Sequence, residues 1–142
     1  MTAKRPGLED YPLAETQPSK VLGPNGRSLE ELTLQGIMDG TITMEDLRIT
    51  PSALEAQADI AEAAGRPNLA ANFRRASELT RVPQEVIMAT YERLRPGRAS
   101  GKQELLETAR HLRETYDAHR IADFVEEAAE VYERRGLYKF RY

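Results

Sequence analysis

Two histidines are the side chains in this sequence with the clearest potential for chemistry. His111 and His119 lie eight residues apart, more than two helical turns, so they cannot share a metal ion on one straight helix as histidines at i and i+4 can. The chain has no cysteine and no G-x-S-x-G turn, so the sequence supports neither nucleophilic catalysis nor a thiolate metal site. We interpret both histidines as surface or interface residues.

A run of carboxylates near the carboxyl end resembles the acidic face of a metal-binding bundle: Asp123, Glu126, Glu127 and Glu130. A carboxylate-bridged di-iron site needs Glu-x-x-His pairs, and the sequence has none. Glu130 and Arg134 have the i,i+4 spacing of an ordinary surface pair. We therefore interpret the run as a solvated face, and we predict no catalytic, cofactor-binding or metal-binding residue in this chain.

Arginines occur in two groups that could bind phosphate: Arg74, Arg75 and Arg81, then Arg93, Arg95 and Arg98. Acidic residues interleave with both groups: Glu78, Glu85 and Glu92. The whole chain carries a formal net charge of −3, and it lacks both a P-loop and a dinucleotide-binding glycine fingerprint. Nucleic-acid binding is therefore the weaker interpretation.

The composition predicts one unit with a thin hydrophobic core. Of 142 residues, 29 are Leu, Val, Ile or Phe, about the one-fifth level at which a chain has little apolar area to bury. Such a chain gains stability from a partner. No apolar run has the length of a signal peptide or a membrane span, so we expect a cytosolic protein that does not enter the membrane.

Residues typical of helix starts predict an all-α fold of about five main helices. Thr50 can cap a helix whose first position is Pro51. Pro67 and Pro83 stand before further runs with helical spacing. No segment alternates apolar and polar residues as a strand does.

The second half of the chain predicts two helices with a break between them. Ser100 and Gln103 form a capping box for the first, and the apolar stripe changes phase near residues 116–118, where we place the break. Phe124 and Val125 are expected to be buried, either within the chain or against a partner. Phe124→Ala would then cost about 3–5 kcal/mol if the site is fully buried.

The first half has two further features. Residues 1–27 contain four prolines among polar residues and predict an extended arm, with residues 28–142 forming the helical domain. Ser28 with Glu31, and Thr43 with Asp46, have capping-box spacing. The helix after Pro51 has a face of small residues that would let another backbone approach closely.

Several strings resemble one family, the small, or gamma, subunit of adenosylcobalamin-dependent diol and glycerol dehydratases. They are DYPLA (10–14), LTLQGIMDG (32–40), MEDLRITPSALEAQADIAEAAGR (44–66), NLAANFRRASELTRVP (68–83), YERLRP (91–96) and FVEEAAEVYERR (124–135). The resemblance covers residues 11–135. Its most specific part is LRITPSALEAQADIAEAAGR followed by NFRRASELT.

The resemblance implies a non-catalytic subunit of a hydro-lyase that converts 1,2-propanediol to propanal, or glycerol to 3-hydroxypropanal, by a radical mechanism. It implies large and medium partner subunits, assembled as a dimer of heterotrimers, which bind the adenosylcobalamin, the substrate and its metal ion. The expected location is the cytoplasm, with a bacterial microcompartment as the alternative. Members linked to microcompartments often have a longer amino-terminal extension, whereas residues 1–9 alone precede DYPLA here.

One position departs from the family pattern, because the family often has arginine where this chain has Glu126. An ion pair that the family makes there is expected to be absent or reversed. A second hypothesis, from a different class, is a free-standing helical adaptor or regulatory protein. It is motivated by the arginine-rich surface and the absence of a recognisable active site.

Overall fold

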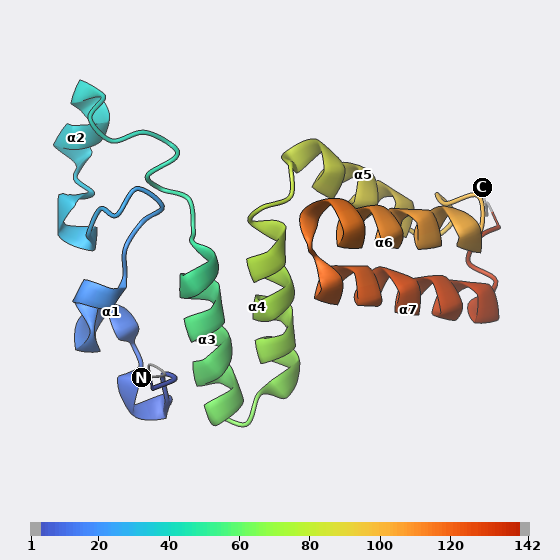
Figure 1. The fold of residues 1–142 in the computed structure, drawn as a ribbon, viewed down its shortest axis with the longest axis horizontal. Helices are drawn as coiled ribbons and strands as arrows, with labels where there is room; N and C mark the ends of the chain where they lie inside the picture. The colour runs from blue at the N-terminus through green and yellow to red at the C-terminus, as the bar shows by residue number, and fades with distance from the viewer. Residues whose placement is uncertain (1–3, 140–142) are drawn as a thin grey trace. The chain divides into compact units, whose positions relative to one another are not determined.

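The computed structural model describes residues 4–139 and confirms the all-α fold. Five main helices, α3 to α7, follow a series of shorter turns, and the described residues contain no strand beyond one isolated bridge between Leu22 and Ser28 (Figure 1). The shorter elements are η1 (Leu8–Asp10), α1 (Leu13–Thr16), η2 (Pro18–Lys20), η3 (Leu29–Glu31) and α2 (Leu34–Asp39). The main helices are α3 (Pro51–Ala63), α4 (Pro67–Leu79), α5 (Gln84–Leu94), α6 (Lys102–Tyr116) and α7 (His119–Arg135).

The chain forms two compact units, Met1–Thr80 and Arg81–Tyr142. The first holds the short turns and the α3–α4 hairpin, and the second holds α5 and the α6–α7 hairpin. The domain boundary that the sequence suggests after residue 27 does not coincide with the division between these units, and it stays a prediction. Within residues 4–139 no helix combines the length with the apolar character that spanning a bilayer requires.

The α3–α4 hairpin begins as predicted, because the Thr50 hydroxyl accepts a hydrogen bond from the Ala53 N–H at 3.2 Å and Pro51 takes the first helical position. Ala58 and Ala61 of α3 are buried with Ala70 of α4. The small side chains bring the two helices of this chain close together. The alanine face is therefore buried within the chain and is not available to a partner.

The expected extended arm is more ordered than its prolines suggest, because residues 8–20 form three short helical turns. Asp10 holds two of them together: it accepts a hydrogen bond from the Gly7 N–H at 2.8 Å and one from the Gln17 amide at 2.5 Å. The spacing of the prolines does not predict local hydrogen bonds of this kind. η1 also contacts α3, so this part of the arm lies on the hairpin of the same unit.

The second unit holds the largest fully buried side chains among the residues that the structure describes. Leu105 and Leu112 of α6 and Val125 of α7 have no measurable exposure. The predicted helix break is confirmed, since α6 ends at Tyr116 and Asp117 adopts a left-handed φ of 53° before α7 begins. Asp is one of the few non-glycine residues that tolerates this conformation.

One prediction for this unit needs correction, and another is confirmed in part. Ser100 pairs with Glu104, not Gln103: the Ser100 N–H and hydroxyl both approach Glu104 Oε2, at 2.8 and 2.9 Å. The reason is that α6 begins at Lys102, later than a capping box starting at Ser100 would place it. Val125 is buried within the chain as expected. Phe124 is 40% exposed, so for this residue burial against a partner is the alternative that stays a prediction.

Candidate functional site: an apolar docking surface

The two histidines make local contacts only with residues of their own hairpin among those the structure describes. The His111 ring lies 3.1 Å from the Thr115 hydroxyl and packs edge-on against Tyr116. His119 Nε2 lies 2.7 Å from the Asp117 carboxylate. Both side chains are exposed. Both contacts join exposed residues only two or four positions apart in sequence, so we interpret them as local surface pairs.

The carboxylates of α7 bind cations of the facing helix. Arg113 on α6 donates to both oxygens of Glu126, at 2.6 and 2.9 Å, and to Asp123 at 2.7 Å. These hydrogen bonds lower the pKa of Glu126. Glu126 therefore makes an ion pair within its own hairpin.

Lys102 forms a second cross-link between α6 and α7. Its ammonium lies 2.8 Å from both Glu130 and Glu133, and these hydrogen bonds raise the pKa of Lys102. Glu130 therefore pairs across helices, where the sequence suggested a pair with Arg134. Among residues 4–139, no three histidine or acidic side chains come together in a group that could hold a metal ion.

The first arginine group is divided among separate structural contacts. Arg74 on α4 reaches Asp59 at 3.1 Å and Glu62 at 2.5 Å on α3. Arg81 donates to the backbone carbonyls of Tyr116 and Asp117, both at 3.0 Å, and so satisfies the carboxyl end of α6. The group does not converge on one site.

The second arginine group is also matched by acidic side chains. Arg93 lies 3.3 Å from Glu104, while Arg95 and Arg98 lie 3.1 and 3.2 Å from Glu92. A phosphate would have to displace these carboxylates. The structure therefore gives no support to the phosphate-binding interpretation.

Exposed apolar side chains concentrate in one region, residues 22–49, which we call the 22–49 segment. Its exposed large apolar side chains are Leu22, Leu29, Leu34, Ile37, Met38, Met44, Leu47 and Ile49. Ile42 is the one large apolar side chain of this segment that is buried. Soluble monomers rarely expose large apolar patches, and those that exist commonly mark interaction sites.

Three of these side chains share one face of α2. Leu34, Ile37 and Met38 are spaced i, i+3 and i+4, which places them together on a helix. Thr33 caps the start of α2, because its hydroxyl accepts a hydrogen bond from the Gly36 N–H at 3.1 Å, and Gly40 caps its end with a φ of 81°. The turn of helix is thus well capped although its apolar face is exposed.

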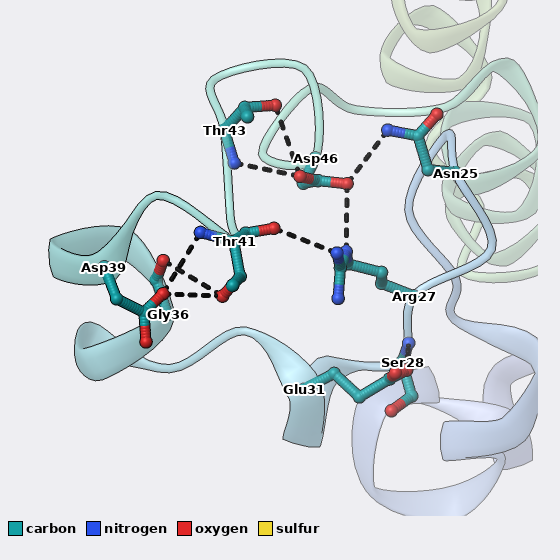
Figure 2. A network of polar contacts seen from close by, with 9 residues as sticks. All are labelled: Asn25, Arg27, Ser28, Glu31, Gly36, Asp39, Thr41, Thr43 and Asp46. Atoms are coloured by element: carbon teal, nitrogen blue, oxygen red, sulfur yellow. Dashed lines mark hydrogen bonds and ion pairs between the residues drawn. The ribbon is translucent and has the colours of Figure 1, made fainter.

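The interior of the 22–49 segment is polar (Figure 2). Asp46 is buried and accepts hydrogen bonds from the Thr43 N–H at 2.9 Å and the Asn25 amide at 2.9 Å, and it pairs with Arg27 at 3.2 Å. Arg27 also donates to the Thr41 carbonyl at 2.9 Å. The hydrogen bond from the Thr43 N–H is the largest cause that lowers the pKa of Asp46, and the hydrogen bond from the Asn25 amide lowers it further. One carboxylate therefore joins the turn that contains Asn25 and Arg27 to the turn that contains Thr43.

A close backbone contact completes this arrangement. A Cβ added at Gly36 would lie 2.6 Å from Ile42 Cγ1, so only glycine lets Ile42 pack there. The Ile42 N–H donates to the Gly36 carbonyl at 2.9 Å. The capping-box spacing of Thr43 and Asp46 predicted one bond of the network. The partners Asn25 and Arg27 lie about twenty residues away in sequence, where spacing gives no signal.

A separate groove lies between the amino-terminal turns and the α3–α4 hairpin. It has a volume of about 580 Å³ and is lined mainly by apolar residues, including Leu8, Tyr11, Ile60 and Phe73, with Arg66 as its charged side chain. Leu8 and Tyr11 are themselves more than half exposed. The first unit therefore exposes apolar side chains outside the 22–49 segment as well.

Comparison with known proteins identifies the family. Residues 7–139 match the model of the dehydratase small subunit. A propanediol dehydratase small subunit of Salmonella typhimurium strain LT2 is 44% identical over 137 residues, covering 96% of this chain and 79% of the relative. The corresponding protein of Citrobacter freundii is 44% identical over 131 residues, covering 92% of this chain and 76% of the relative. The chain belongs to the dehydratase small-subunit family.

Proposed function

We propose that this chain is the small, non-catalytic subunit of a propanediol dehydratase. The observation that carries the proposal is the 44% identity, along nearly the whole chain, to two proteins named as propanediol dehydratase small subunits. The reaction is the dehydration of 1,2-propanediol to propanal by a radical mechanism, carried out by partner subunits. Glycerol is the alternative substrate, and the choice between the two belongs to those partners.

The partners in this proposal are a large and a medium subunit, assembled with the small one as a dimer of heterotrimers in the cytoplasm. Adenosylcobalamin supplies the radical chemistry and is bound by the partners. The histidine, arginine and carboxylate side chains described above are engaged in helix caps and cross-links, which suits a subunit that leaves the cofactor to others. The free-standing adaptor is not favoured by the family match.

Co-expression tests the proposal directly. This chain, carrying an affinity tag, is produced with candidate large and medium dehydratase subunits, and the purified material is tested for subunit ratio and for propanal formation. Equal amounts of three chains and activity that depends on this one are expected. Recovery of this chain alone, together with full activity in a preparation that lacks it, would contradict the proposal.

A further inference from the structure

We infer that the 22–49 segment is a preformed docking platform for one partner subunit of the dehydratase, whose matching surface is apolar and bordered by basic side chains. The inference rests on the proposed function and adds to it the face that makes the contact. It combines three observations about the segment: its outward apolar side chains, its polar interior and its charge.

The apolar side chains of the platform are too exposed to stabilise the isolated chain. Leu34, Met38 and Met44 are 73%, 75% and 77% exposed, so most of their apolar area still contacts water. Apolar burial is favourable by about 25 cal/mol per Å², and this gain is realised only when another surface covers them. Methionine suits such a contact because its flexible side chain adapts to the partner's shape.

The polar interior explains how the segment keeps its shape without a hydrophobic core. Asp46, buried among Thr43, Asn25 and Arg27, fixes the loops through hydrogen bonds and one ion pair. A surface that is already ordered loses less conformational entropy on binding than a flexible one does. The network therefore presents the exposed side chains in a fixed arrangement before the partner arrives.

The charge of the platform indicates what covers it. Residues 22–49 contain five acidic and two basic side chains, a net charge of −3, which equals the formal net charge of the whole chain. Arg27 pairs with Asp46 and Arg48 with Glu45. Glu30 and Asp39 face no cation among the residues that the structure describes, and both are exposed. The platform thus combines exposed apolar side chains with a net negative charge.

This charge selects among possible occupants. A second copy of the chain would bring two negatively charged segments together, and like charges across an interface are unfavourable. Nucleic acid and anionic lipid are repelled for the same reason. A protein surface with arginine or lysine around an apolar centre is complementary, and the family match supplies partner subunits as its source.

The experiment uses two matched double variants of the full-length chain. Met38→Lys with Met44→Lys places cations on the platform, and Met88→Lys with Tyr91→Lys does the same on α5, where both side chains are more than half exposed. Binding of each purified variant to the co-expressed large and medium subunits is measured by titration. Circular dichroism and thermal unfolding of the free chain verify that both variants fold.

The platform variant is expected to bind about 100-fold more weakly than the wild type, because two central contacts are lost and like charges meet. The α5 variant should bind within about threefold of wild type, as peripheral substitutions commonly do. Glu30→Lys with Asp39→Lys should slow association and remove the loss of affinity that added salt causes in the wild type.

Other outcomes separate the two proposals. A wild-type chain that fails to bind either subunit would overturn the proposed function and the platform together. Wild-type affinity in the platform variant, with loss of binding in the α5 variant, would overturn the platform alone. A concentration-dependent dimer of the free chain that the platform variant abolishes, seen by sedimentation, would assign the surface to a second copy and also overturn the inference.

Discussion

The α6–α7 hairpin and the 22–49 segment use apolar side chains in opposite ways. Leu105 and Leu112 of α6 have no measurable exposure, whereas Met38 and Met44 of the 22–49 segment are about three-quarters exposed. In the hairpin, charged residues cross-link the outside of an apolar interior. In the 22–49 segment, the carboxylate of Asp46 lies inside and the apolar side chains lie outside. The hairpin therefore satisfies its own apolar surface, while the 22–49 segment depends on a neighbour to cover its apolar surface.

The first prediction tests this difference where it is largest. Leu112→Ala should lower the free energy of unfolding by about 2–5 kcal/mol, because it removes fully buried methyl groups and leaves a cavity. Met38→Ala should change the stability of the free chain by less than about 0.5 kcal/mol, as exposed substitutions usually do. Denaturant unfolding followed by circular dichroism measures both. A cost above about 1 kcal/mol for Met38→Ala would show that the platform is packed in the free chain.

The second prediction concerns Phe124, which lies on α7 beside the buried Val125. At 40% exposure, Phe124→Ala should cost the free chain about 2 kcal/mol, below the range for a fully buried phenylalanine. Phe124→Leu is the control and should cost about 1 kcal/mol or less. A loss above about 3 kcal/mol for the alanine variant would indicate complete burial. A larger loss in the assembled enzyme than in the free chain would place Phe124 at a subunit contact.

The third prediction tests whether charge holds the α3–α4 hairpin. Arg74 is one-fifth exposed and meets Asp59 and Glu62 on the facing helix. Arg74→Met should destabilise the free chain by about 1 kcal/mol at low salt and by less at high salt, because salt screens a partly exposed ion pair. The matched control is Arg48→Met, whose pair with Glu45 is mostly exposed and should contribute almost nothing. Equal effects at both positions would contradict this assignment.

The sequence predicted the helical elements well because their signals are local. The start of α3 and the break between α6 and α7 each depend on the backbone conformation of one or two residues, namely Thr50 with Pro51, and Asp117. Sequence spacing alone is therefore enough to locate both. The predicted start of α6 was wrong by one residue. Gln103 and Glu104 are both suitable capping partners, and only the backbone conformation selects between them. Such choices depend on geometry that composition does not contain.

The docking surface was predictable only in outline. A low content of strong core formers indicated a chain that depends on a partner, and the structure locates most of the exposed large apolar side chains in the first unit. The small-residue face of α3 predicted the close approach of another backbone, and α4 supplies that backbone because the hairpin returns within the same unit. The network around Asp46 joins Asn25 and Arg27 across long sequence separations, which no periodic pattern reveals.

The last prediction has the smallest and most local effect, and it concerns the polar interior of the platform. Hydrogen bonds from Thr43 and Asn25 favour the charged form of Asp46 and so lower its pKa. A carboxylate with a lowered pKa contributes stability above its unfolded pKa of about 3.9, and this contribution is lost as the pH falls through the lower, folded value. The chemical shift of the Thr43 amide should therefore titrate with a midpoint below about 3.9, while the amides of the α6–α7 interior stay unchanged at that step.

In Asp46→Asn this titration should disappear, and hydrogen exchange across the 22–49 segment should be faster at neutral pH. A midpoint of 4 or higher, or unchanged exchange in the variant, would mean that Asp46 does not hold the platform together.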